Sequence, residues 1–248
     1  MTETLEGKSA LVTGAAGVLG AAISASLVEA GLKVVMLDVA AERLQEVASG
    51  LGPAARPLAL DISDPQAVAA ACERVRAEQG EIDVLVNNAG ILSNNKAAQT
   101  APEEWRRVMG VNLDGAFYLA RAWLPAMKAK GWGRIVNICS LASKTGGLTA
   151  GTAYSTSKGG LTALTLSLAR ESAASGVTVN GIAPAYIKTP MVTDQLTEAQ
   201  RQKLLSEIPV GRFCEAEEVA HVVRFLVSPL SGFITGEIID INGGLLMD

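Results

Sequence analysis

Short apolar segments alternate with longer helical patterns along all 248 residues of the chain. The apolar segments read as strands buried on both faces, and they cover Ser9–Thr13, Val34–Asp38, Arg56–Leu60, Val84–Asn87, Arg134–Ile138, Thr178–Ile182 and Glu237–Ile241. Helices are expected at about 18–30, 40–50, 65–79, 102–130, 154–174 and 215–228. Parallel neighbours need crossover connections, so seven such strands predict an α/β fold with a doubly wound, seven-stranded parallel sheet and helices on both faces.

One domain is expected over residues 1–248, because no Pro-, Ser- or Gly-rich linker interrupts the chain. The segment at about 186–213 breaks the alternation just after a strand, and it carries apolar residues at Met191, Val192 and Leu196. Ligands of open α/β sheets bind at the carboxyl ends of the strands. The segment is therefore expected to be a substrate lid.

Two helix starts are marked by capping residues. Asp64 precedes Pro65 and is expected to cap the helix that begins there. Thr100 and Glu103 have the spacing of a capping box around Pro102.

Charge and composition exclude several classes of protein. The net charge is −4 and no run of Lys or Arg exceeds two residues, so no nucleic-acid partner is expected. No apolar stretch approaches ~18 residues, which argues against a membrane span. Cys72, Cys139 and Cys214 lack metal-ligand or redox spacing, and the single histidine, His221, lies in a helical pattern, so no metal site is expected. The polar, acidic N-terminus is unlike a signal peptide, and a soluble cytoplasmic protein is predicted.

A glycine-rich turn follows the first predicted strand and precedes an Ala-rich helix. Gly14 allows the tight turn, Gly17 lets the backbone approach a pyrophosphate, and Gly20 permits close packing of helix and strand. The first helical residues, Val18 and Leu19, turn free N–H groups toward the phosphates. The pattern is Gly-x2-Gly-x2-Gly rather than the commoner Gly-x-Gly-x2-Gly, and an ordinary strand–turn–helix is the alternative. We interpret it as a Rossmann-type dinucleotide site.

Asp38 ends the second predicted strand, where a carboxylate would accept hydrogen bonds from the adenosine ribose. A carboxylate there would repel a 2′-phosphate, and no Lys or Arg stands at 15–19 or 39–41. NAD(H) is therefore favoured over NADP(H). The alternative for Asp38 is a cap for the helix that starts near Ala40.

Two further strand ends supply candidate cofactor contacts. Asp61, with Ile62 beside it, is expected to reach the adenine, or else to be only a turn residue. Asn88, Ala89 and Gly90 end the fourth strand, where small residues let the backbone lie against a cofactor. The alternative for these three is an ordinary strand-ending turn.

Tyr154 and Lys158 are four residues apart in a helical pattern and so share one face. A free phenol has a pKa near 10 and is a poor base at neutral pH. An ammonium ~4 Å away contributes ~4 kcal/mol at an effective dielectric of ~20, about three pKa units. The pair therefore predicts a tyrosine suited to general acid–base chemistry.

The chain resembles the short-chain dehydrogenase/reductase family over essentially its whole length. The motifs that carry the resemblance are Thr13-Gly14-x2-Gly17-x2-Gly20, Asn87-Asn88-Ala89-Gly90, Asn112 in Val-Asn-Leu, Ser140 and Tyr154-x3-Lys158. The resemblance implies that Tyr154 is the acid/base and that Lys158 lowers its pKa and binds the nicotinamide ribose. It further implies that Ser140 hydrogen-bonds the reacting oxygen and that Asn112 holds a water in a proton relay.

Two departures from the family pattern lie near these residues. The interval from Ser140 to Tyr154 is 14, one longer than in many members, which makes Ser143 a rival for the role of Ser140. Pro184 is followed by Ala185 where the family usually has glycine. By the same resemblance, Pro184, Ile187 and Thr189 lie at the nicotinamide, the last two at its carboxamide.

Several substrates fit the resemblance. Carrier-protein reductases typically have arginines where this chain has approximately Gly131 and Ser175, and reductases of fatty-acid synthesis usually use NADPH. These differences favour an NAD(H)-dependent enzyme that interconverts a small secondary alcohol, such as a polyol or hydroxy acid, and its ketone. One alternative is a 3-oxoacyl-thioester reductase acting on a carrier protein or CoA, and another is a non-catalytic dinucleotide-binding regulator. A homotetramer is expected by resemblance.

Overall fold

Seven parallel strands form one sheet in the computed structural model, which describes residues 4–189 and 197–247. The strand order is β3-β2-β1-β4-β5-β6-β7, so the direction of winding reverses between β1 and β4. The strands are β1 (Ser9–Thr13), β2 (Lys33–Asp38), β3 (Ala55–Ala59), β4 (Val84–Asn87), β5 (Gly133–Ile138), β6 (Val177–Pro184) and β7 (Ile238–Ile241). The predicted doubly wound, Rossmann-type α/β fold is confirmed, with strand bounds within two residues of the prediction.

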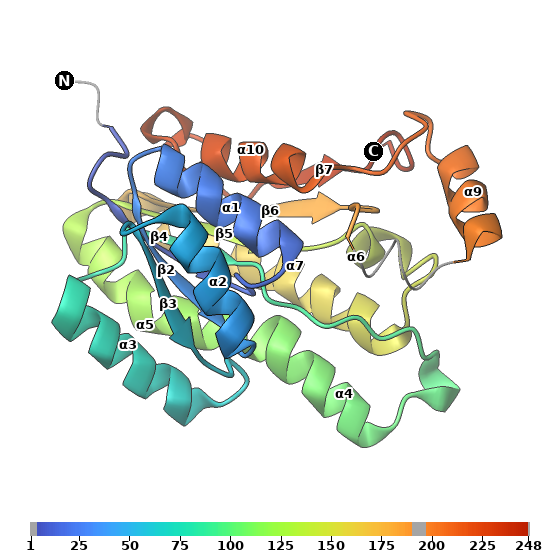
Figure 1. Ribbon diagram of the computed structural model, residues 1–248, viewed down its shortest axis with the longest axis horizontal. Coiled ribbons are helices and arrows are strands. Elements are labelled where there is room, and N and C mark those ends of the chain that lie inside the picture. The colour runs from blue at the N-terminus through green and yellow to red at the C-terminus, as the bar shows by residue number, and fades with distance from the viewer. Residues whose placement is uncertain (1–3, 190–196, 248) are drawn as a thin grey trace.

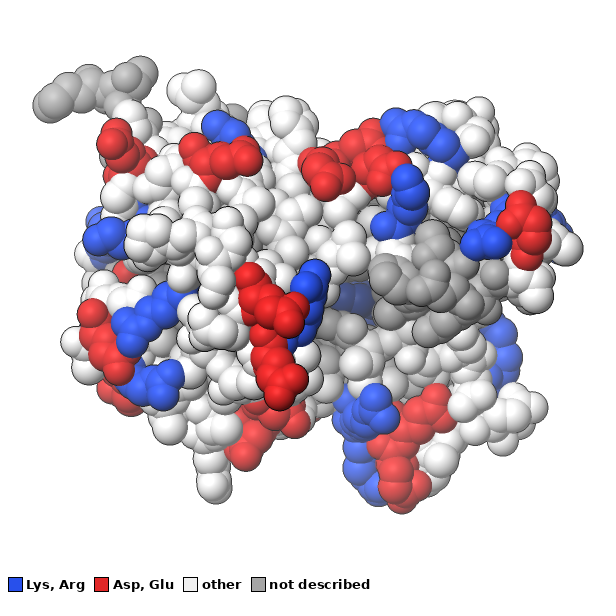
Figure 2. All heavy atoms as spheres, viewed as in Figure 1, with Lys and Arg blue, Asp and Glu red and all other residues white. Residues whose placement is uncertain are grey.

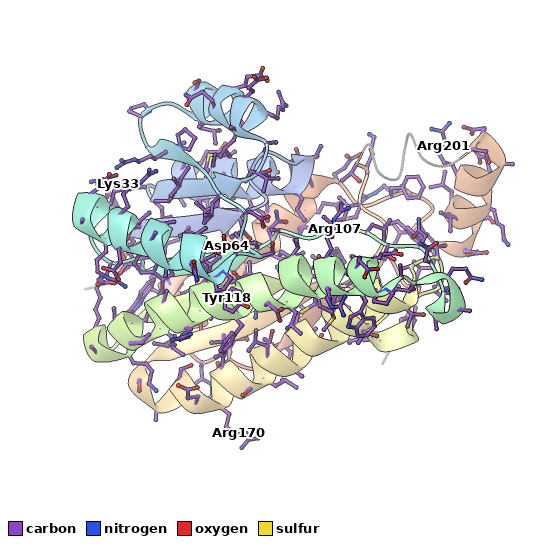
Figure 3. All side chains as sticks on the ribbon, turned by 90° about the horizontal axis from the view of Figure 1, so that it is seen from below. Lys33, Asp64, Arg107, Tyr118, Arg170 and Arg201 are labelled. Atoms are coloured by element: carbon purple, nitrogen blue, oxygen red, sulfur yellow. The ribbon has the colours of Figure 1, made fainter. Side chains whose placement is uncertain are left out.

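Helices cover both faces of the sheet (Figure 1). On one face lie α1 (Val18–Glu29), α2 (Ala41–Leu51) and α10 (Ala216–Val227); on the other lie α3 (Pro65–Gln79), α5 (Gly115–Lys130) and α7 (Thr152–Ser172). Figure 3 looks onto the second layer, where α3, α5 and α7 lie side by side.

Alternate residues of each strand supply two separate cores. On β1, Val12 packs with Ile23 of α1, whereas Leu11 belongs to the core formed with Trp123 of α5. Both faces of β1 are therefore buried, which explains why the strand reads as a continuous apolar run instead of an alternating one. The sheet is thus fixed from both sides, and its carboxyl edge is a rigid base for a site.

The helix predicted at 102–130 is two helices, α4 (Pro102–Met109) and α5, joined by one π-helical turn, η2 (Gly110–Asp114). Asn112 lies in this turn, and its side chain bonds to the backbone of Ile91. Such turns cluster at functional sites. A 3.6-residue apolar pattern continues through a single wide turn, so the sequence does not reveal it.

Of the two predicted caps, one is correct. The Asp64 side chain accepts hydrogen bonds from the N–H groups of Gln66 and Ala67 at the start of α3. The box predicted at Thr100 is wrong: Ala101 is the N-cap of α4, and the Thr100 hydroxyl bonds instead to the carbonyl oxygens of Asn95 and Lys96.

The predicted lid contains a helix that the sequence did not predict, α9 (Glu198–Glu207). Residues 190–196, with Met191, Val192 and Leu196, lie outside the described residues. The two ends of the lid are joined where Ile187 pairs with Cys214 in an isolated β-bridge. Its role as a lid stays a prediction.

The remaining elements are short, and they are α6 (Ala142–Thr145), η1 (Ala97–Gln99), η3 (Ala173–Ser175) and η4 (Pro229–Ser231). All three cysteines are free thiols. Among the helices of residues 4–189 and 197–247, none combines the length and apolar character needed to cross a bilayer.

Candidate active site

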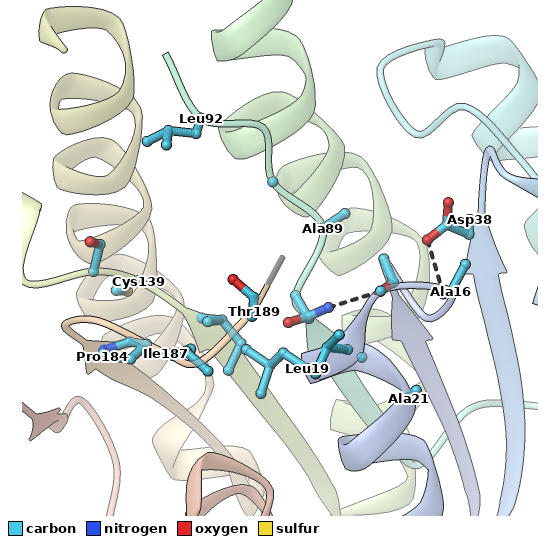
Figure 4. Close-up of a pocket in the computed structure, with 18 of the residues that line it drawn as sticks. Ala16, Leu19, Ala21, Asp38, Ala89, Leu92, Cys139, Pro184, Ile187 and Thr189 are labelled. Carbon is cyan, nitrogen blue, oxygen red and sulfur yellow. Dashed lines mark hydrogen bonds between the residues drawn. The ribbon is translucent and has the colours of Figure 1, made fainter. Parts of the chain in front are cut away.

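A pocket of about 630 Å³ lies at the carboxyl ends of β1, β2, β4, β5 and β6, a size typical of small-molecule sites. It runs from Asp38 and Ala16 at one end to Leu92 and Cys139 at the other (Figure 4). Most residues predicted for the site line it: Gly14, Gly17, Val18, Leu19, Gly20, Asp38, Asn88, Ala89, Gly90, Ser140, Tyr154, Lys158, Pro184, Ile187 and Thr189.

Asp61 and Ile62 do not line this pocket. The Asp61 carboxylate accepts hydrogen bonds from the N–H and the hydroxyl of Ser63 at 2.9 and 2.7 Å, so it closes a turn. The Ile62 side chain is buried against Gly115 at the start of α5. Their placement at the adenine, expected from their position after β3, stays a prediction.

The glycine turn is held in place by the end of β4. Gly14 has φ +65°, and a side chain there would meet the backbone of Ala89 at 2.9 Å. The Asn88 amide donates hydrogen bonds to the carbonyl oxygens of Thr13 and Gly14. The Thr13 hydroxyl in turn accepts from the N–H groups of Asn88 and Ala89, both at 2.9 Å. The two loops therefore form one rigid corner.

The other two glycines of the turn, Gly20 and Gly17, differ in how much space a side chain would have. A Cβ at Gly20 would lie 2.1 Å from the carbonyl oxygen of Gly14, so only glycine fits there. A Cβ at Gly17 would meet nothing closer than that same oxygen at 3.5 Å, and its φ of −75° suits any residue. No side chain caps α1, whose first-turn residues line the pocket. This open, positive helix end fits the pyrophosphate of a dinucleotide.

Gly20→Ala is expected to lower the free energy of unfolding by roughly 1–3 kcal/mol, because the methyl group overpacks the corner. Gly17→Ala is expected to change it by less than about 0.5 kcal/mol while weakening dinucleotide binding. Urea unfolding and quenching of intrinsic fluorescence by the dinucleotide measure the two effects separately. Equal losses of stability in both variants would contradict the assignment of Gly17 to ligand approach.

Ser140, Tyr154 and Lys158 meet at the inner end of the pocket. Ser140 lies two residues after β5 and is 9% exposed, and its hydroxyl accepts a hydrogen bond from Ala142 N–H at 3.1 Å. The rival, Ser143, does not line the pocket and donates instead to the Ser140 carbonyl oxygen. The Lys158 ammonium is buried, donates to the Ile138 carbonyl oxygen at 2.7 Å, and lies 5.9 Å from the Tyr154 ring centroid.

The electrostatics of this pair differ from those expected from spacing alone. Burial raises the pKa of Tyr154 above its ordinary value, and a hydrogen bond with Ser140 partly offsets the rise. Burial also lowers the pKa of Lys158 to about 8, while nearby Cys139 acts in the opposite direction. The ammonium is engaged by a carbonyl rather than by the phenol. The four-residue spacing thus predicted the shared face correctly but not this contact.

Asn112 lies behind the pocket, not in its wall. Its amide oxygen accepts from Ile91 N–H at 2.8 Å, and its amide nitrogen donates to the Ile91 carbonyl oxygen and to the Ser157 hydroxyl. The Ser157 hydroxyl donates to the Tyr154 carbonyl oxygen at 2.8 Å. Asn112 therefore links the π-helical turn to the helix that carries Tyr154 and Lys158.

Several lining residues were not predicted: Ala16, Ala21, Arg43, Leu92, Ile138, Cys139 and Ala185. Most adjoin a predicted residue and could have been found by extending each motif. Arg43 could not be found in this way. It reaches the pocket from α2 and lies beyond residues 15–19 and 39–41, where a positive charge beside Asp38 would be expected. Ala185 has no positive φ, so alanine replaces the family's glycine without strain.

Comparisons with known proteins cover nearly the whole chain. A family model described as enoyl-(acyl carrier protein) reductase matches residues 14–246. The chain is 41% identical over 243 residues to the 3-oxoacyl-[acyl-carrier-protein] reductase of Escherichia coli, with 98% of each chain covered. The corresponding reductases of Vibrio cholerae and Pseudomonas aeruginosa are 41% and 40% identical, with 98% of this chain and 99% of theirs covered.

These relatives show that the predicted preference for NAD(H) over NADP(H) is wrong. They are 3-oxoacyl-[acyl-carrier-protein] reductases, the class that usually takes NADPH by the resemblance described above. The structure supplies a physical reason. Both carboxylate oxygens of Asp38 accept backbone hydrogen bonds, from Ala16 and Ala40 at 3.0 Å each, so Asp38 caps this corner. Arg43, which pairs with Glu46 at 2.9 Å, lines the same part of the pocket.

Proposed function

Because the chain belongs to the short-chain dehydrogenase/reductase family, whose members are NAD(P)-dependent oxidoreductases of CH–OH groups, we propose that it is a 3-oxoacyl-thioester reductase using NADPH. The observation that carries the proposal is the 40–41% identity, over 98% of the chain, to reductases named for that substrate. The pocket supports it with a dinucleotide corner at one end and a serine–tyrosine–lysine group at the other. This was the alternative reading of the sequence, and it replaces the small-alcohol dehydrogenase as the leading one.

The residues fit a bound dinucleotide along the length of the pocket. The turn from Gly14 to Gly20 would hold the pyrophosphate, Asp38 and Arg43 would face the adenosine ribose, and Ile187 with Thr189 would lie at the nicotinamide. When bound, the reduced nicotinamide supplies a hydride. Asn88, Ala89 and Gly90 would support the middle of the molecule.

Ser140 and Tyr154 would act on the 3-oxo group of the substrate. The Ser140 hydroxyl donates a hydrogen bond to the carbonyl oxygen and orients it, while the Tyr154 phenol gives that oxygen its proton as the carbon accepts the hydride. The raised pKa of Tyr154 keeps the phenol protonated, the state needed for reduction. The Lys158 ammonium, together with a water held by Asn112, would then restore the proton from solvent.

A second candidate is the reduction of a small ketone that is not attached to a carrier protein. Gly131 and Ser175 stand where carrier-protein reductases typically have arginines. The nearby Lys128 is paired with Glu171, and Lys130 with Asp83. On the face shown in Figure 2, basic and acidic side chains are interspersed. An acidic carrier protein favours a basic surface, and paired lysines attract it weakly.

We expect kcat/KM for a 3-oxoacyl thioester with NADPH to exceed that for polyols, hydroxy acids and simple secondary alcohols by at least about a hundredfold. The assay follows NADPH and NADH fluorescence with one acyl group presented on carrier protein, on CoA and on N-acetylcysteamine. Equal rates on carrier protein and N-acetylcysteamine would favour the second candidate. A faster reaction with a polyol would contradict the proposal, and no turnover with any substrate would leave the dinucleotide-binding regulator.

Two further expectations accompany this function. A homotetramer stays a prediction, supported by the exposed apolar side chains Phe117 on α5 and Leu166 on α7. A cytoplasmic location likewise stays a prediction, since the substrates proposed here are soluble metabolites or carrier-bound acyl groups.

A further inference from the structure

The segment that follows β4, residues 91–96, connects three parts of the molecule, and we call it the β4 strap. Its first residue, Ile91, is held by both ends of the Asn112 amide. Leu92 points into the pocket (Figure 4). At its far end the Lys96 ammonium donates to the Ala150 carbonyl oxygen at 2.7 Å. The strap therefore lies between the π-helical turn, the pocket and the start of α7.

The strap caps the helix that carries Tyr154. The carbonyl oxygens of Ser93 and Asn95 accept hydrogen bonds from Gly151 and Thr152, at 2.7 and 3.0 Å. Gly151 is the N-cap and Thr152 the first residue of α7, so their N–H groups have no partner within the helix. No side chain caps this end of α7. A Cβ at Gly151 would lie 2.4 Å from the Asn95 carbonyl oxygen, so strap and helix are in close contact.

One carboxylate holds the strap from the other side. Glu104, in the first turn of α4, accepts the Ser93 hydroxyl on one oxygen at 2.6 Å and the Asn95 amide on the other at 2.8 Å. These bonds lower the pKa of Glu104, so the group is ionised at neutral pH and the bonds are charge-assisted. The two residues that Glu104 holds by their side chains are the two whose carbonyls cap α7.

We propose that Glu104 is a positioning residue for the acid/base tyrosine, acting through Ser93 and Asn95 on the first turn of α7. The inference rests on the proposed function in one respect, the role of Tyr154 as proton donor. Proton transfer requires the phenol within hydrogen-bond reach of the substrate oxygen, and Tyr154 lies only two residues after Thr152. A small displacement of this turn therefore costs rate rather than cofactor affinity.

Glu103 provides a matched control. It also lies in the first turn of α4 and contributes the same charge to the helix end. Its side chain is exposed and pairs only loosely with Arg106, at 3.5 Å. Glu103→Ala removes an acid from the same turn without touching the strap.

The experiment compares Glu104→Ala, Glu104→Gln and Glu103→Ala in the full chain. In Glu104→Ala we expect faster amide hydrogen exchange at Gly151 and Thr152, measured without any substrate, and a kcat lower by roughly tenfold or more with an unchanged dinucleotide Kd. Glu104→Gln, which keeps one acceptor oxygen and adds a donor, is expected to lie between the wild type and Glu104→Ala. Glu103→Ala is expected to match the wild type in every measurement.

Two results would overturn the inference: unchanged exchange at both amides, or faster exchange with a kcat equal to that of Glu103→Ala. If Glu104→Ala does not fold, the same two criteria apply to Glu104→Gln. If the wild type turns over no substrate, the proposed function fails, and the exchange rates alone still decide whether Glu104 fixes the start of α7.

Discussion

Tyr154→Phe is expected to lower kcat by about a thousandfold or more while changing the dinucleotide Kd by less than about tenfold. The substitution removes one oxygen from a side chain that faces Ser140 at the inner end of the pocket. The ring and its packing remain, so the helix and the cofactor corner are unaffected. What is lost is the phenol proton that would pass to the substrate oxygen, and the Lys158 ammonium is engaged with a backbone carbonyl instead.

The measurement pairs steady-state turnover with fluorescence titration of the dinucleotide. Tyr118→Phe is the matched control, because it removes a phenol oxygen from α5, beside α3 and outside the pocket. It is expected to retain the wild-type rate. A Tyr154→Phe variant with more than about a tenth of the wild-type kcat would rule out Tyr154 as the proton donor and shift that role to another group.

The sequence predicted the sheet closely because most of its strands obey a simple physical rule. Strands such as β4 and β5 are buried on both faces, so each of their residues must be apolar or hydrogen-bonded. The apolar segment in the sequence therefore ends close to where the buried strand ends. The π-helical turn at Gly110–Asp114 follows no such rule. Its cause is tertiary, a bond from Asn112 to a loop twenty-one residues away, and a local pattern contains no trace of it.

The candidate site was predictable to the extent that its residues follow strand ends. Gly14 and Asn88 directly follow β1 and β4, Asp38 ends β2, and Ser140 lies two residues after β5. Parallel topology brings such positions together. Asp61 also follows a strand, but β3 lies at the sheet edge, and the Asp61 carboxylate bonds to Ser63 without lining the pocket. Position after a strand is therefore informative only once the strand order is known.

Two residues that act from helices outside any recognised motif could not be predicted from the sequence. Arg43 and Glu104 lie on α2 and α4 among other exposed charges, and only the fold shows which of them points to the pocket or the strap. The pKa shifts of Tyr154 and Lys158 likewise could not be predicted from the sequence, because they depend on how deeply each group is buried.

That burial makes Lys158 the source of a second large effect. Desolvation lowers its pKa from the ordinary 10.5 to about 8 in the folded protein. Between these values the unfolded chain binds a proton that the folded chain does not, so this group makes folding more favourable as the pH rises. Over the full interval the contribution is about 3 kcal/mol.

Lys158→Met keeps the length of the side chain and removes the titration. We expect the free energy of unfolding of the wild type, relative to this variant, to increase by roughly 2 kcal/mol between about pH 7.5 and 9.5. Other groups, the Cys139 thiol beside Lys158 included, titrate in both proteins and largely cancel. The variant is also expected to lose at least about a hundredfold in kcat/KM, because the site loses its buried cation.

Urea unfolding at the two pH values, followed by circular dichroism, measures the difference. Lys33→Met, which removes an exposed cation from the first residue of β2, controls for the loss of one positive charge and is expected to show no such change. A Lys158→Met difference that stays constant between the two pH values would mean that the ammonium is solvated. The Lys158 ammonium would then not lower the free energy of unfolding. Its position beside Tyr154 would no longer be an example of stability lost in favour of catalysis.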